Sequence, residues 1–177
     1  MAGFTPIILS MKRLPVKIIS GGQTGVDRAA LDAALALGIP CGGFCPKHRR
    51  AEDGTIPLCY PLNETKTSQY PERTRLNIEN SDGTIILFQL GFDRGTTLTA
   101  SICRQKQKPL LIVDLDSKPD PDHTIRWIEK YEIRILNIAG PREKSSPGIY
   151  NSAHEFLLKL FMSFTVQDRA LIRARTN

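Results

Sequence analysis

The sequence predicts a single α/β domain of the Rossmann-like type, in which helices cover both faces of a doubly wound parallel β-sheet. Two observations lead to this prediction. From residue 16 onward, short apolar runs typical of buried strands alternate with segments whose apolar residues recur at helical spacing. A glycine-rich turn at residues 20–25 joins the first strand-like run to the first helical segment.

Five or more strands are expected, and five can be located, each a short apolar and often β-branched run. They cover residues 16–20, 39–44, 84–88, 110–113 and 133–138. In a doubly wound sheet, ligands bind at the carboxyl edge where the strand order reverses. We therefore expect the strand order 2-1-3-4-5, with the ligand crevice between the first and third strands.

Helices are expected between these strands and after the last one. Val26, Ala29, Ala33 and Leu37 recur at helical spacing, and Gly38 ends this first helix. Later helices are expected over residues 71–80 and 98–105, from residue 120 and from residue 146.

The chain is expected to consist of an N-terminal arm at residues 1–14, the Rossmann-like domain at 15–165 and a basic C-terminal tail at 166–177. The longest apolar stretch, residues 4–11, is too short to span a bilayer and lacks the features of a signal peptide. We expect a cytoplasmic protein without a membrane segment.

Composition narrows the class of protein further. The hydrophobic fraction of 41% and the charged fraction of 24% are typical of a globular domain and exclude a fully disordered or fibrous chain. The net charge of +6 favours an anionic ligand. Aromatic residues make up only 7%, and no basic stripe is interleaved with them, which argues against a nucleic-acid groove.

Cys41, Cys45 and His48 have a spacing that suits zinc ligands, although no second close pair follows. The alternative is that the cysteines are free thiols, which pack like small apolar residues. A long polar segment at residues 46–70 follows, and its basic residues, among them Arg50, lie at the expected ligand edge. This segment is interpreted either as a solvated surface loop or as part of the site.

The glycine-rich turn is the strongest candidate binding element, and it consists of Ser20, Gly21, Gly22, Gln23, Thr24 and Gly25. Backbone amides at such a turn, together with the helix dipole, favour a phosphate. Asp27 and Arg28 follow in the first helical turn, where Asp27 either complements the dipole or accepts a hydrogen bond from a polar ligand. A tight turn without a ligand is the alternative interpretation.

A second candidate turn follows the third strand and contributes Gly91, Arg94, Gly95, Thr96 and Thr97. Arg94 is expected to supply charge, and the amides after it hydrogen-bond donors. If the first and third strands are neighbours, both turns flank one crevice. Arg142 follows the fifth strand and is interpreted either as a third ligand contact or as a surface residue.

Residues 18–32, 91–99 and 139–150 resemble the family of molybdenum cofactor carrier proteins, which belongs to the SLOG group of Rossmann-like nucleotide-sensing and nucleotide-processing domains. The resemblance implies a homo-oligomer, often a tetramer. It also implies that the chain binds and protects the molybdenum cofactor, a pterin phosphate, for storage or for delivery to molybdoenzymes. Phe161 and Phe164 are expected to be exposed on the last helix, where they suit an oligomer interface.

SLOG proteins also include phosphoribohydrolases with a Pro-Gly-Gly-x-Gly-Thr-x-x-Glu motif. Aligning that motif on Gly95 and Thr96 places Thr99 where the catalytic glutamate belongs. A carrier is therefore favoured over an enzyme. The alternatives are a nucleotide-processing enzyme or nucleotide sensor of the same superfamily and, less in accord with the composition, a nucleic-acid-binding domain.

Overall fold

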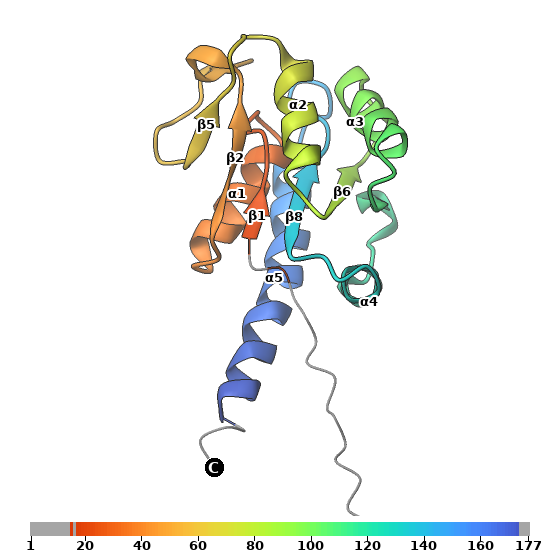
Figure 1. Cartoon of the computed structure of the whole chain (residues 1–177). Coiled ribbons are helices and arrows are strands. Elements are labelled where there is room, and N and C mark those ends of the chain that lie inside the picture. The colour runs from red at the N-terminus through yellow and green to blue at the C-terminus, as the bar shows by residue number, and fades with distance from the viewer. Residues whose placement is uncertain (1–14, 16, 174–177) are drawn as a thin grey trace, which may run out of the picture.

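The computed structural model describes the backbone of residues 15 and 17–173 and the side chains up to Phe164. It confirms a single α/β domain with a six-stranded parallel sheet between helices (Figure 1). The sheet strands are β1 (Lys17–Ile19), β2 (Cys41–Cys45), β5 (Leu62–Glu64), β6 (Gly83–Phe88), β7 (Leu110–Asp114) and β8 (Ile135–Ala139). Their spatial order is β5-β2-β1-β8-β6-β7.

Five α-helices surround the sheet in the described part of the chain. They are α1 (Val26–Ala36), α2 (Tyr70–Glu79), α3 (Arg94–Gln105), α4 (Pro121–Lys130) and α5 (Ile149–Arg173). Helices α1 and α5 pack together on one face with α4 beside α5, while α2 and α3 lie over the other face (Figure 1). The largest core cluster lies under α1 and α5, where Ala29, Ala33 and Leu157 are fully buried.

The expected strand order is wrong in one respect, because β8 lies between β1 and β6. Strand β8 is the fifth strand of the prediction, and it pairs in parallel with both neighbours. Its residues Leu136 and Ile138 are fully buried, and buried Asn137 donates a hydrogen bond to Thr84 Oγ of β6 at 3.1 Å. Strands that follow one another in sequence are often neighbours in space, but this chain returns to the centre of the sheet for its last strand.

The polar segment at residues 46–70 is structured around a buried arginine. It contains a short antiparallel hairpin of β3 (Arg50–Ala51) and β4 (Gly54–Thr55) before β5 joins the main sheet. The guanidinium of Arg49 is buried, and it donates hydrogen bonds of 2.8–3.2 Å to the carbonyls of Ile56, Pro57, Tyr60 and Leu62. Arg49 therefore holds this segment together and is not available to a ligand.

The four cysteines are free thiols, and burial raises the pKa of the Cys45 thiol. Among the described residues, no group of three or more His, Cys, Asp or Glu side chains is placed to hold a metal ion.

The last helix differs from expectation in its packing. Phe161 and Phe164 are only 0% and 3% exposed, because both join the core under the sheet instead of facing solvent. Helix α5 also continues to Arg173, past the expected domain boundary at residue 165, whereas the expected arm at residues 1–14 lies outside the described residues. Within the described residues, no helix is both long and apolar enough to cross a membrane.

Candidate functional site

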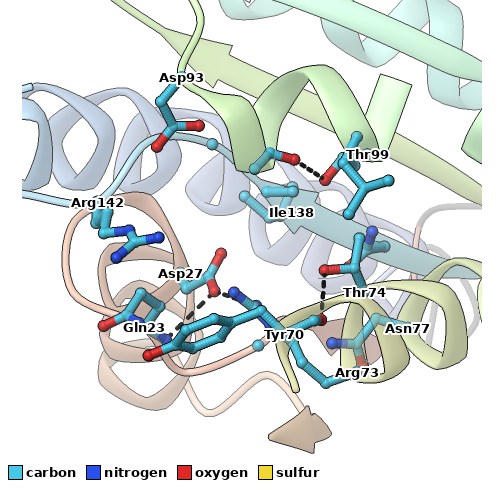
Figure 2. A pocket seen from close by; sticks show the side chains of 16 residues that line it. Gln23, Asp27, Tyr70, Arg73, Thr74, Asn77, Asp93, Thr99, Ile138 and Arg142 are labelled. Carbon is cyan, nitrogen blue, oxygen red and sulfur yellow. Dashed lines mark hydrogen bonds and ion pairs between the residues drawn. The ribbon is translucent and has the colours of Figure 1, made fainter. Parts of the chain in front are cut away.

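A pocket opens at the carboxyl edge of the sheet, above the ends of β1 and β8 (Figure 2). The glycine-rich turn, α2, the start of α3 and the end of β8 all contribute to its wall. Its empty space is about 600 Å³ when the mouth open to solvent is included. A pocket in this position is typical of a small-molecule site in an open α/β sheet.

Both predicted turns reach this pocket, although their strands are not neighbours. Gly21, Gln23 and Asp27 line it from one side, and Gly95 lines it from the other. Between the two turns lies the end of β8, and Figure 2 shows its Ile138 near Thr99. The pocket thus lies over an inserted central strand and not directly between two adjacent strands.

Several backbone amides at and just after the glycine-rich turn donate hydrogen bonds within the protein. The Gln23 amide donates to Asp27 Oδ2 at 3.2 Å, and the Thr24 amide donates to Gln23 Oε1 at 3.0 Å. The first helical amide, that of Val26, donates to the carbonyl of Pro141 at 3.2 Å. In this conformation these three amides are therefore not free to hold a phosphate.

Two glycines of the turn serve close packing. Gly22 and Gly25 have φ angles of +75° and +76°, a region that glycine adopts without strain. A Cβ at Gly22 would lie 2.4 Å from Leu62 Cδ1, and a Cβ at Gly25 would lie 2.5 Å from the carbonyl oxygen of Pro141. Neither residue lines the pocket, and neither does Ser20, whose hydroxyl donates to the Ile138 carbonyl at 2.8 Å.

The second turn is capped by its own aspartate. Asp93 Oδ1 accepts hydrogen bonds of 2.8 Å from both the amide and the hydroxyl of Thr96, and its carbonyl accepts from the Thr97 amide. Thr96 is buried, while Gly91, Arg94 and Thr97 are exposed residues outside the pocket wall. Of the predicted residues in this turn, Gly95 alone lines the pocket.

Gln23 presents an unused donor at the pocket. Its side chain is only 5% exposed, and its Oε1 accepts from the amides of Thr24 and Glu52, both at 3.0 Å. These two donors fix the orientation of the side-chain amide, so that Nε2 is the other atom. Nε2 is buried and has no hydrogen-bond partner among the described residues. Buried donors without a partner are rare, which indicates a missing acceptor.

Helix α2 adds residues that sequence reasoning missed. Arg73 Nη1 lies 2.6 Å from Asp27 Oδ2, and both side chains are largely buried. The guanidinium covers Gly21 so closely that a Cβ there would lie 1.4 Å from Nη1. The sequence carries no signal for this contact, because α2 follows a long loop and its arginines resemble those of a solvent-exposed helix.

Three guanidinium groups surround the ring of Tyr70 at the start of α2. The carbon atoms of the Arg50, Arg73 and Arg142 guanidinium groups lie 5.5, 6.0 and 5.4 Å from its centroid. These are cation–π distances. The sequence allowed Arg142 to be either a ligand contact or a surface residue. In the structure it lines the pocket together with Tyr70 (Figure 2).

The β3–β4 hairpin is fastened to the glycine-rich turn by acidic residues. The Thr24 hydroxyl donates a hydrogen bond to Glu52 Oε1, and the other carboxylate oxygen of Glu52 lies 3.9 Å from Arg142 Nη1. Arg28 forms a bidentate pair with Asp53, and this pairing holds the pKa of the Asp53 carboxyl below its usual value. Arg28 is therefore directed to the hairpin and does not line the pocket.

Comparison with known proteins places these features in context. The model of one family, described as the circularly permutated YpsA SLOG family, matches residues 18–161. A crystal structure from Syntrophus aciditrophicus SB, named "Putative molybdenum carrier protein", is 45% identical with a TM-score of 0.78. The match covers 83% of this chain and 94% of that one. No curated protein sequence matches significantly.

Proposed function

Because the chain belongs to the circularly permutated YpsA SLOG family, we propose that its pocket binds the molybdenum cofactor and that the protein carries this cofactor. Storage and delivery to molybdoenzymes are both covered by this proposal. A similar protein named as a molybdenum carrier supports it. The observation that carries it is a pocket in which a buried donor, Gln23 Nε2, has no partner among the described residues and lies beside a cluster of arginines around Tyr70.

The chemistry of these groups suits a pterin phosphate. A pterin is a flat heteroaromatic ring with several hydrogen-bonding atoms, and its recognition requires a few well-placed polar groups in a concave site. Guanidinium groups bind phosphate through charge-assisted hydrogen bonds. The pocket wall offers both kinds of partner, with Gln23 on the glycine-rich turn and Arg73 and Arg142 beside Tyr70.

A test of the proposal measures protection and transfer of the cofactor. Cofactor released from a molybdoenzyme is incubated with or without this protein, and samples are then added to a molybdoenzyme lacking its cofactor. We expect the cofactor to keep its ability to activate the cofactor-free enzyme for longer when the protein is present. We expect Arg142→Glu to reduce this protection. Equal rates of loss with and without the protein would contradict the proposal.

We also expect no phosphoribohydrolase activity. Thr99 stands where the catalytic glutamate of those enzymes belongs, and its hydroxyl donates to the Gly95 carbonyl at 2.9 Å. The two aspartates of the pocket have other tasks, since Asp27 pairs with Arg73 and Asp93 caps α3. Release of ribose 5-phosphate from nucleoside monophosphates at about 1 per second or faster would replace the carrier proposal by an enzymatic one.

A further inference from the structure

The two helix ends at the pocket offer little to a phosphate. Asp27 lines the pocket from the first turn of α1, and Asp93, the N-cap residue of α3, lines it from the other helix. The amides of Gln23 and Thr96 already donate to these same two carboxylates. A phosphate placed here would meet the Asp93 carboxylate at the start of α3. At α1 it would meet the Asp27–Arg73 pair, whose charges cancel, so that neither helix end adds net positive side-chain charge to its dipole.

Positive charge is concentrated elsewhere, around Tyr70. Arg73 is neutralised by Asp27 at 2.6 Å, but Arg142 lies 3.9 Å from its nearest acidic partner, Glu52. Arg50 is exposed and forms no ion pair with the described residues. The surroundings of the Tyr70 ring therefore have a net positive charge, which favours the binding of an anion.

The inner wall has the opposite character. Gln23 Nε2 is a buried hydrogen-bond donor without an acceptor among the described residues. Asp27 lies beside it, with its carboxylate bound by the Gln23 backbone amide, and this 4% exposed carboxylate is a hydrogen-bond acceptor. An aminopyrimidinone ring, the hydrogen-bonding end of a pterin, presents a carbonyl oxygen next to N–H groups. That edge is complementary to one donor beside one acceptor.

We infer that the ligand lies with its aminopyrimidinone end against Gln23 and Asp27 and with its phosphate at Arg50 and Arg142 around Tyr70. This orientation rests on the proposed function and specifies its site. Gln23 is then a specificity-determining residue, because an analogue without the carbonyl acceptor leaves Nε2 unpaired. The glycine-rich turn reads the head group of the ligand instead of its phosphate.

The sharpest variant is Gln23→Glu. It retains an oxygen to accept from the Thr24 and Glu52 amides, and it replaces the donor Nε2 by an acceptor. Gln69→Glu is the matched control, since it adds the same charge at an exposed position next to Tyr70. The probes are unsubstituted pterin, which is uncharged at neutral pH and fluorescent, and inorganic phosphate. Arg50→Ala serves as the variant of the phosphate end.

We expect Gln23→Glu to weaken pterin binding by about tenfold or more, because a donor to the ligand is lost and an acceptor faces its carbonyl. Its phosphate affinity should match that of Gln69→Glu. Arg50→Ala should weaken phosphate binding by about fivefold or more and leave pterin binding within about twofold. Unchanged pterin affinity in a folded Gln23→Glu protein would overturn the orientation, as would phosphate binding that depends on Gln23 but not on Arg50.

A second measurement needs no variant at position 23. Lumazine carries a carbonyl where pterin carries its amino group, so it sets an oxygen against the Asp27 carboxylate. Wild-type protein should prefer pterin over lumazine by about tenfold or more; equal affinity would refute the orientation. If the protein binds the intact cofactor but fails these comparisons, the proposed function stands and the orientation falls. If it binds neither the cofactor nor pterin, the proposed function itself is wrong.

Discussion

At the scale of single residues, Gly25 shows how the pocket depends on close backbone packing. Its φ is +76°, and an added Cβ would lie 2.5 Å from the Pro141 carbonyl oxygen. Gly38 has a similar φ of +66°, but a Cβ added there would have no atom within 4 Å. We expect Gly25→Ala to lower the free energy of unfolding by about 2–4 kcal/mol and Gly38→Ala by about 1 kcal/mol.

Urea unfolding of the two variants measures this difference. Gly38→Ala reports the cost of the backbone conformation alone, so the excess for Gly25→Ala is the cost of separating the glycine-rich turn from the segment after β8. Equal losses of stability would show that this contact yields without cost. Such a result would remove the packing role assigned to Gly25.

The candidate site was partly predictable at this scale. Gly21, Gln23 and Asp27 line the pocket as expected from the glycine-rich turn, because a turn after a parallel strand lies at the ligand edge whatever the strand order. Tyr70 and Arg73 were not predictable, since their position depends on the path of a loop that precedes α2. Local pattern also says nothing of side-chain partners, which is why Arg28 was expected at the ligand and instead pairs with Asp53.

At the scale of elements, the sequence predicted the positions of the strands along the chain better than their order in the sheet. The runs that form β6, β7 and β8 are apolar enough to be recognised from their composition. The order of the strands in the sheet depends on which side of β1 each crossover reaches. No feature of the β8 sequence marks it as a central strand, and the hydrogen bond from Asn137 to Thr84 of β6 is visible only in the structure. Strand β5 was missed because it has only three residues within a polar segment.

Arg49 provides a test of how the segment at residues 46–64 is held. Its guanidinium is buried and donates to four carbonyls, so Arg49→Met should leave those carbonyls without donors. We expect a loss of about 3 kcal/mol or more in the free energy of unfolding, with faster amide hydrogen exchange around residues 50–62. Arg75→Met, at an exposed arginine that forms an ion pair with Glu79 at 3.7 Å, is the control and should cost less than about 1 kcal/mol. Equal effects of the two substitutions would contradict this role.

At the scale of the whole molecule, we propose a homo-oligomer, with a tetramer favoured. The phenylalanines of α5 no longer support it, but β7 is an edge strand on which Ile112 is 39% exposed, and Leu90 is 79% exposed. An edge strand with exposed apolar side chains on it and near it is a common site of association. Light scattering should give a mass well above the 19.7 kDa of one chain. A monomer at micromolar concentration would rule the oligomer out.

The central claim is that the pocket at the ends of β1 and β8 binds the molybdenum cofactor. The most direct measurement is the molybdenum and pterin content of protein purified from a host that makes this cofactor, with Arg142→Glu purified in parallel. The proposal predicts molybdenum and pterin in equimolar amounts with the wild-type protein. It also predicts a reduction of about tenfold or more in the variant, whose charge at the pocket is reversed. Wild-type protein without pterin, or a folded variant with the same content as the wild type, would contradict the claim.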